Sequence, residues 1–158
     1  MKYSIVFVFI LFSNCAFACG SGLQKAKMAH QLYVDTEMRQ FVCASDSCSE
    51  NAFADRLMFH RFEQMFRGHG LRVCLVEPAL TAANSYTGVF AETGGNYRLQ
   101  FISYGAGVKF EKNGRGVPLL KEYAITDHRD DYSSVSIYLW NQSHFIYSRD
   151  MQMHVMAN

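Results

Sequence analysis

The sequence predicts an α+β fold in a single domain, with an N-terminal helical hairpin packed on an antiparallel β-meander of about six or seven strands. In residues 23–42 and 50–67, apolar side chains recur every three or four positions, which is the period of an amphipathic helix. From residue 71 to residue 149, apolar and polar side chains alternate in short runs, as in strands. Because the strands follow the helices instead of alternating with them, we expect an antiparallel sheet and separate layers.

The strand-rich region is the most regular part of the sequence. Residues 71–76 form a short apolar run that Pro78 ends, and residues 117–125 form another extended segment. Glycine and asparagine suit a reversing chain, because they adopt positive φ at low cost. Alternating runs lie at residues 97–101, 108–111 and 135–139, and turn residues lie at 93–96, 105–107, 113–116 and 141–142.

Two helices are expected before the strands. In residues 23–42 the apolar stripe includes His30, for which we expect a buried ring satisfied by a neighbouring carbonyl. Ser47 followed by Glu50 predicts a capping box at the start of the second helix, residues 50–67. Phe59 lies away from the apolar stripe of that helix. It is therefore a candidate either for packing on another element or for contact with a partner.

The first eighteen residues have the pattern of a signal peptide. Lys2 supplies the positive region, residues 5–12 are unbroken apolar sequence, and Ala16-Phe17-Ala18 has the small-x-small pattern of a cleavage site. The apolar run is shorter than the roughly 20 residues that cross a bilayer. The expected organisation is a signal peptide at residues 1–18 and one domain at residues 19–158. We expect a location in the periplasm or outer membrane of a bacterium, or otherwise secretion.

Composition excludes some classes of partner. Removing residues 1–18 leaves 140 of the 158 residues, which is enough for one domain with its own core. Without Lys2 the chain has 14 basic and 14 acidic residues. A net charge of zero gives no electrostatic reason to expect nucleic acid or an anionic membrane surface.

Cys19 would be the first residue of the mature chain, and it has two interpretations. It is a lipidation candidate, because a bacterial lipoprotein begins with an acylated cysteine and would be attached to the membrane through it. Ordinary cleavage is the alternative, and it leaves four cysteines, an even number that suits two disulfides. Acylation instead leaves three cysteines, so that one thiol has no partner.

The disulfide candidates are Cys19, Cys43, Cys48 and Cys74. Sequence leaves open whether Cys43 pairs with Cys48 or whether one of them pairs with Cys74. Cys19 and Cys43 would lie at opposite ends of a helix about 30 Å long, which is too far for a bridge. If Cys19 is not acylated, the expected pairs are Cys43–Cys48 and Cys19–Cys74.

No motif in the sequence indicates catalysis, a cofactor or a metal. The glycine pairs lie between strands, where hairpin turns explain them, and there is no Gly-x-Ser-x-Gly or His-Glu-x-x-His pattern. Whether the chain is an enzyme stays open, although a non-catalytic role is favoured. The densest polar cluster is a predicted surface loop, and it supplies further partner-contact candidates. These are Asp127, His128, Arg129, Asp130 and Asp131.

A short motif resembles one family of binding proteins. Gly88-Val89-Phe90, at the start of a strand and before a run of hairpins, resembles the Gly-x-aromatic opening of lipocalin-like half-barrels. The resemblance implies a curled sheet around a small apolar ligand, and no residue of a ligand site follows from it.

The expected function is that of a non-catalytic binding protein outside the cytoplasm. A signal segment, bridge-forming cysteines and the lack of a catalytic motif favour this class. The expected partner is a protein of the cell envelope, with the chain acting as an inhibitor or immunity protein of an envelope enzyme. A carrier of a small apolar ligand is the alternative, and an enzyme whose site assembles from distant residues is another.

Overall fold

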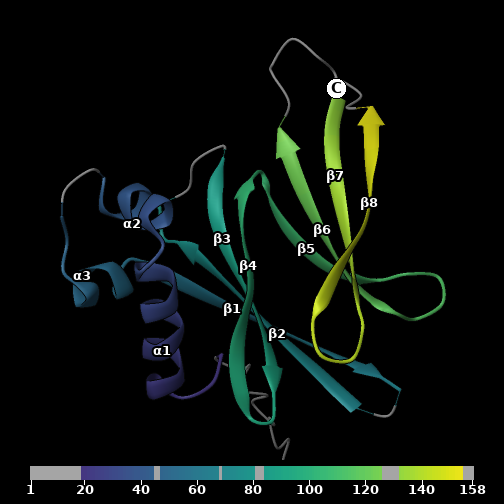
Figure 1. Ribbon diagram of the computed structural model, residues 1–158, viewed down its shortest axis with the longest axis horizontal. Helices are drawn as coiled ribbons and strands as arrows, with labels where there is room; N and C mark the ends of the chain where they lie inside the picture. The colour runs from purple at the N-terminus through teal and green to yellow at the C-terminus, as the bar shows by residue number, and fades with distance from the viewer. Residues whose placement is uncertain (1–18, 45–46, 68, 81–83, 126–131, 155–158) are drawn as a thin grey trace, which may run out of the picture.

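The computed structural model describes residues 19–44, 47–67, 69–80, 84–125 and 132–154 (Figure 1). Three short helices precede eight strands. The helices are α1 (Gly22–Tyr33), α2 (Thr36–Cys43) and α3 (Glu50–Ala54). The strands are β1 (Leu57–Phe66), β2 (His69–Pro78), β3 (Ser85–Thr93), β4 (Asn96–Gly105), β5 (Gly107–Lys112), β6 (Pro118–Ile125), β7 (Tyr132–Trp140) and β8 (Phe145–His154).

The strands form two antiparallel four-stranded sheets, with the orders β1-β2-β3-β4 and β5-β6-β7-β8. The antiparallel α+β arrangement is as predicted, but the expected single sheet of six or seven strands is wrong. The chain passes between the sheets at Ala106, whose amide donates to the Tyr123 carbonyl oxygen at 2.7 Å. A Cβ at Gly105 would meet that same carbonyl oxygen, so the crossing needs glycine there.

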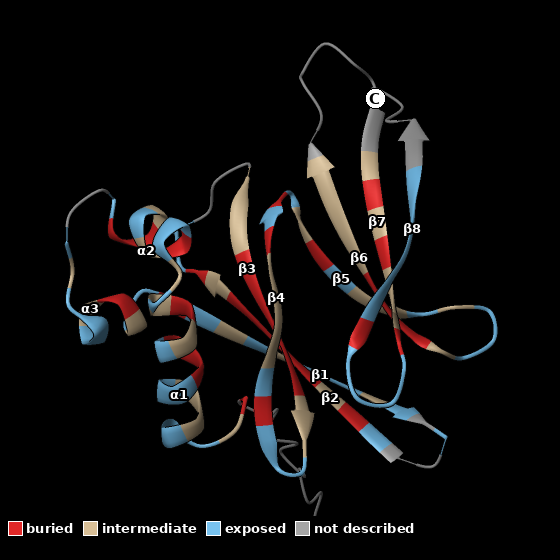
Figure 2. Cartoon of the chain, viewed as in Figure 1, coloured by how far each residue is buried: buried red, intermediate tan, exposed pale blue. Residues whose placement is uncertain are grey.

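The molecule has three layers, with the first sheet in the middle. In Figure 1 the helices lie on one side of the first sheet and the second sheet lies on the other. Cys74 and Val76 of β2 face the helices, whereas Val73 and Leu75 face the second sheet. All four are buried, which explains why residues 71–76 are apolar without alternation (Figure 2).

The long first helix predicted for residues 23–42 is wrong, because the chain breaks between α1 and α2. Asp35 lies in extended backbone, and its side chain accepts a hydrogen bond from the Met38 amide at 2.8 Å. Such an N-cap starts a new helix. His30 is also exposed instead of buried, and its Nδ1 lies 3.1 Å from Oε1 of Glu50.

The second predicted helix, residues 50–67, is wrong over most of its length. Only Glu50–Ala54 is helical, its N-cap is Ser49 instead of Ser47, and Leu57–Phe66 is strand β1. Strand β1 pairs with β2 along its whole length, from Leu57 opposite Pro78 to Phe66 opposite His69. These ladder hydrogen bonds and the packing of Leu57 and Phe59 on the helical layer outweigh the intrinsic helix preference of the segment.

Two disulfides join the helical layer to itself and to the first sheet. Cys43 is bonded to Cys48, and Cys19 is bonded to Cys74 of β2, with Cα atoms 5.7 Å apart in each bridge. These are the pairs expected for a chain whose Cys19 is not acylated. Within the described residues, no helix combines the length and the apolar character needed to cross a membrane.

Gly88 of β3 determines how closely α1 packs on the first sheet. A Cβ at this position would lie 2.6 Å from Cδ2 of Leu32, a side chain that is completely buried. Gly88→Ala is therefore expected to lower the free energy of unfolding by about 1–3 kcal/mol through overpacking, as measured by urea denaturation. Gly114→Ala is the control, because a Cβ there meets nothing within 4 Å. Equal stability of the two variants would show that α1 can move away from β3 at no cost.

Candidate functional site

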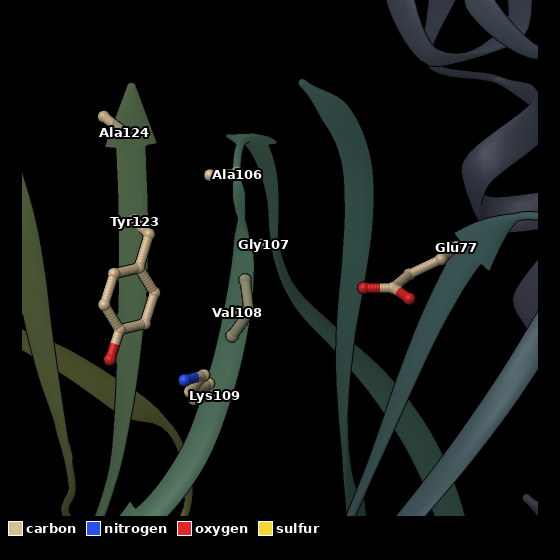
Figure 3. Close-up of a pocket in the computed structure, with 7 residues that line it drawn as sticks. All are labelled: Glu77, Ala106, Gly107, Val108, Lys109, Tyr123 and Ala124. Atoms are coloured by element: carbon tan, nitrogen blue, oxygen red, sulfur yellow. The ribbon is translucent and has the colours of Figure 1, made fainter. Parts of the chain in front are cut away.

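An open pocket lies where the two sheets diverge beside the crossing at Ala106 (Figure 3). Its volume is about 450 Å³. Strand β2 of the first sheet supplies one wall, and strands β5 and β6 of the second sheet supply the other. We call this site the inter-sheet pocket, and it is lined by Glu77, Ala106, Gly107, Val108, Lys109, Tyr123 and Ala124.

Glu77 is the acidic group of the inter-sheet pocket, and two neighbours hold its carboxylate. Oε1 accepts a hydrogen bond from Oγ1 of Thr87 at 3.1 Å, and Oε2 lies 3.7 Å from Nε2 of His60. Thr87 is buried, whereas the Glu77 side chain keeps 31% of its surface exposed. Figure 3 shows the Glu77 side chain on the first sheet and the ammonium of Lys109 beside the Tyr123 ring on the second sheet. The pocket therefore presents a carboxylate of fixed orientation that solvent and ligands can reach.

The second sheet contributes a cation and an aromatic ring, which lie on its outer face because Val108 and Phe110, on either side of Lys109, point to the core between the sheets. Nζ of Lys109 lies 5.3 Å from the centroid of the Tyr123 ring, within the range of a cation–π interaction. In the described parts of the chain, no carboxylate forms an ion pair with Lys109. Ala106 and Gly107 add almost no side-chain volume, so the mouth of the pocket stays open beside the ring.

Ser103 extends the polar character of the first sheet near the inter-sheet pocket. It is the cross-strand partner of Thr87 and is 2% exposed. Its Oγ has no hydrogen-bond partner among the described residues, which is uncommon for a buried hydroxyl. Thr87 and Ser103 thus place two hydroxyl groups on the face that Glu77 also shares.

A second cluster of charges lies on the opposite, helix-facing side of the first sheet. Arg72 of β2 donates to Glu63 of β1 at 3.2 Å and to both oxygens of Glu92 of β3 at 3.1 Å. Arg61 also donates to Glu63, at 2.7 Å. Hydrogen bonds from Arg61 and then Arg72 hold the pKa of Glu63 below its ordinary value. Side chains that neutralise one another across neighbouring strands are typical of sheet stabilisation.

This network predicts an acid-dependent loss of stability. Because the folded-state pKa of Glu63 is lowered, its contribution is present above the ordinary carboxyl pKa and is lost as the pH falls through the folded-state pKa. Glu63→Gln should therefore reduce the loss of stability between neutral pH and about pH 3. The urea midpoints of the wild type and of Glu63→Gln at the two pH values measure this loss of stability. An identical loss in the variant would contradict the effect of Arg61 and Arg72 on Glu63.

The interior between the sheets is filled with aromatic side chains. The Phe101 ring stacks on that of Tyr138 at 4.6 Å, and Trp140 and Phe110 lie 5.0 and 6.3 Å from Phe145. Oη of Tyr138 donates to Glu122 at 2.7 Å, and burial together with this bond raises the tyrosine pKa. The packed interior leaves the inter-sheet pocket at the margin of the layers instead of in a closed central cavity.

Of the partner-contact residues predicted from the sequence, the structure describes Phe59 alone. Phe59 is half-buried against the helical core, and Nζ of Lys25 lies 5.4 Å from its ring, so packing is its main role. The four cysteines in the described residues are all bridged, including the lipidation candidate Cys19. The charged loop candidates lie outside the described residues: Asp127, His128, Arg129, Asp130 and Asp131. Within the described ranges, no group of three or more metal-ligating side chains is placed to hold a metal ion.

Strand β1 carries an exposed stripe that sequence analysis also missed, because the segment was predicted to be a helix. Met58, His60 and Phe62 alternate along the strand and lie on the face that is turned toward the second sheet. Met58 is 37% exposed and Phe62 is 38% exposed. We call these three residues the β1 stripe; it adjoins the inter-sheet pocket because His60 lies beside Glu77.

No protein-family model, no curated protein and no solved structure matches the chain. The arrangement of its own residues is therefore the basis for any assignment of function.

Proposed function

We propose that the chain is a non-catalytic binding protein that acts outside the cytoplasm and holds its ligand in the inter-sheet pocket. The observation that carries this proposal is the carboxylate of Glu77, which Thr87 and His60 hold at the pocket and which keeps 31% of its side-chain surface exposed. Ligand pockets typically combine a mostly small or apolar lining with a few placed polar groups. The small residues around Ala106 and the ring of Tyr123 supply the remainder of such a lining.

The two other classes fit these contacts less well. A carrier of a small apolar ligand needs an apolar cavity between the sheets, in the space that Phe101, Tyr138 and Trp140 fill. An enzyme that uses His60 as a base would need a hydroxyl or thiol held against the imidazole. The Thr87 hydroxyl donates to Glu77 and not to His60, so its oxygen is not prepared for attack.

A fragment titration tests the binding proposal. ¹⁵N-labelled protein is titrated with a set of small polar compounds, and the amide signals of the pocket residues are followed by NMR. We expect shifts that concentrate around Glu77 and Tyr123 and that decrease in Glu77→Gln. Shifts confined to another face would contradict the proposal. Chemical conversion of any compound, detected in the same samples by mass spectrometry, would contradict the non-catalytic assignment.

A protein partner is the second candidate, in keeping with an inhibitor or immunity protein of a cell-envelope enzyme. It is favoured by the β1 stripe, where Met58 and Phe62 expose apolar side chains on either side of His60 on an edge strand. Apolar side chains beside a polar margin are typical of protein interfaces. Capture from an envelope fraction should recover the same protein with wild type and with Glu77→Gln, but not with Met58→Ser/Phe62→Ser. If the double variant still recovers the same protein, the β1 stripe is not the surface that binds it.

The proposed location includes removal of residues 1–18, so that the mature chain begins at Cys19. The two disulfides are compatible with an extracellular location. Since the Cys19 sulfur is bonded to Cys74, we expect it to carry no acyl chain. Intact mass spectrometry should give the unmodified mass of residues 19–158 with both disulfides. A mass increment of two or three acyl chains would instead show a lipoprotein.

A further inference from the structure

We propose that the protein forms a two-fold symmetric homodimer, in which β1 of each copy pairs antiparallel with β1 of the other and joins the two first sheets into one. This inference concerns the outer side of β1 and does not depend on the inter-sheet pocket. Strand β1 is the first in the order β1-β2-β3-β4, is ten residues long, and pairs with β2 without a shift in register. It contains no proline and no glycine. The outer side of such an edge strand presents backbone N–H and C=O groups to which another strand can add.

The other outer strands of the two sheets are less suited to pairing with a second copy. The Leu99 amide of β4 donates to Oε1 of Gln31 at 3.4 Å, so helix α1 lies against that edge. Strand β5 has six residues, which is short for an edge that pairs. Strand β8 has ten residues, but it carries the charges Arg149 and Asp150 at adjacent positions. Charged side chains and short lengths are the usual means by which edge strands avoid association.

Two-fold symmetry restricts which residues of a strand can lie opposite each other. In an antiparallel pair, directly opposite residues have their side chains on the same side of the sheet. An axis perpendicular to the sheet also places each residue on the same side as its own copy, so opposite positions differ by zero or by an even number. Arg61 and Glu63 of β1 can therefore lie opposite each other, whereas the adjacent Arg149 and Asp150 of β8 cannot.

One register of β1 brings its opposite charges together. With the axis at Phe62, Arg61 of each copy lies directly opposite Glu63 of the other, so the junction contains this opposite-charge pair twice. Moving the axis to Arg61 or to Glu63 places two like charges opposite each other, which is unfavourable. Charge complementarity thus selects a second copy of this chain as the partner, and it also selects the register.

The contacts of Glu63 leave room for a further donor. Its Oε2 accepts a hydrogen bond from Nη2 of Arg61 at 2.7 Å, and its Oε1 accepts one from Nε of Arg72 at 3.2 Å. A carboxylate accepts about four hydrogen bonds, and the Glu63 side chain is 44% exposed. An arginine from the second copy would therefore join the existing network without breaking a pair in either chain.

The other cross-strand pairs in this register are also complementary. The Phe62 rings of the two copies lie opposite each other, and Met65, which is 60% exposed, lies opposite the half-buried Phe59. Aromatic pairs and sulfur–aromatic contacts both stabilise packing. His60 lies opposite Gln64, whose amide oxygen has no hydrogen-bond partner among the described residues. The imidazole of the second copy offers this amide an N–H donor.

Sedimentation equilibrium of residues 19–158, with both disulfides intact, tests for the dimer. We expect a monomer–dimer equilibrium with a dissociation constant on the order of 10 μM, because one pair of strands buries less area than a standard interface. Glu63→Arg should weaken association about tenfold, since it places an arginine opposite Arg61. Arg61→Glu should have the same effect, because it places two glutamates opposite each other.

Mixing the two charge variants is the matched control. In a dimer with one copy of each variant, both cross-strand pairs again have opposite charges, so the equimolar mixture should associate like the wild type. Lys112→Glu reverses an exposed charge at the end of β5 and should leave association unchanged. Thermal unfolding verifies that each variant folds.

Cysteine trapping tests the register without altering either charge. Phe62→Cys places a thiol opposite its own copy, with Cα atoms about 5 Å apart, so treatment with oxidised glutathione should give a covalent dimer. His60→Cys alone should not, because position 60 lies about 13 Å along the strand from its copy. His60→Cys mixed with Gln64→Cys should again give a covalent dimer, since these positions lie opposite each other.

Three results would overturn the inference. The first is a wild type that stays monomeric at millimolar concentration. The second is a dimer that both charge reversals leave intact, or that gives equal covalent dimer with Phe62→Cys and with His60→Cys. The third is capture of an envelope protein that depends on Glu63 while the chain itself stays monomeric, because the β1 edge would then belong to a different partner.

Discussion

Removing the Cys19–Cys74 disulfide with alanine at both positions is expected to lower the free energy of unfolding by about 4 kcal/mol, against about 2 kcal/mol for the same double substitution at Cys43 and Cys48. The two bridges span sequence separations of 55 and 5 residues. A longer closed loop removes more conformational entropy from the unfolded chain, so the longer bridge contributes more. Cys19 and Cys74 are also completely buried, so alanine leaves small gaps there.

Urea denaturation of the wild type and of the two double variants, without added reductant, measures this difference. The double variant at Cys43 and Cys48 is the matched control, because it removes the same atoms from a shorter loop. Addition of reductant to the wild type should reproduce the combined loss. If the two double variants had equal stability, the constraint on the unfolded chain would not be the source of the contribution.

Phe90→Ala is expected to destabilise the protein by about 3–5 kcal/mol, which is typical of a large aromatic side chain removed from a packed core. Phe90 lies in β3 in the middle of the first sheet, is completely buried, and belongs to the core between the sheet and the helices. Alanine at this position removes contacts to both layers. It leaves a cavity that α1 can fill only by moving toward β3.

Phe62→Ala is the control for that prediction. It removes the same atoms from β1 of the same sheet, but Phe62 is 38% exposed. We expect a loss of about 1 kcal/mol or less, because part of the ring already contacts water. Chemical denaturation of both variants gives the comparison. A loss at Phe62 as large as that at Phe90 would mean that the side of β1 turned toward the second sheet is more tightly packed than its exposure indicates.

The strands could be predicted from the sequence because their alternation and their turns agree. Residues 97–101 and 135–139 lie in β4 and β7, and the turn between β3 and β4 contains Gly94 and Gly95. Both glycines have positive φ, 59° and 79°, which is the backbone that this residue allows at low cost. Local preference and tertiary structure point to the same conformation at these positions, so the pattern alone was sufficient.

Strand β1 could not be predicted because its sequence satisfies two periods. Leu57, Met58, Phe62 and Met65 recur at helical spacing, yet Met58 and Phe62 also lie on one face of a strand together with His60. A segment with no proline or glycine has no local signal that separates these alternatives. The pairing with β2 decides between them, and that pairing is a tertiary interaction.

The inter-sheet pocket could not be predicted from the sequence, for a similar reason. Its residues come from positions 77, 106–109 and 123–124, which meet only because the chain crosses between sheets at Ala106. Lys109 and Tyr123 look like ordinary outward-facing strand residues in the sequence. Glu77, a single acidic residue between an apolar run and Pro78, gave the one weak signal. A site assembled from two sheets requires the relative placement of the sheets, and no local pattern carries that information.

The order of the strands has a consequence for how quickly the protein folds. Every ladder joins strands that are neighbours in sequence, from β1 with β2 to β7 with β8. Closing a short loop has a small entropic cost, and topologies dominated by such short-range pairings have low contact order and fold quickly. Each hairpin can therefore form before the next, and distant parts of the chain are joined by the docking of the sheets and the helices and by the Cys19–Cys74 disulfide. We expect this protein to fold faster than a Greek-key sandwich with the same number of strands.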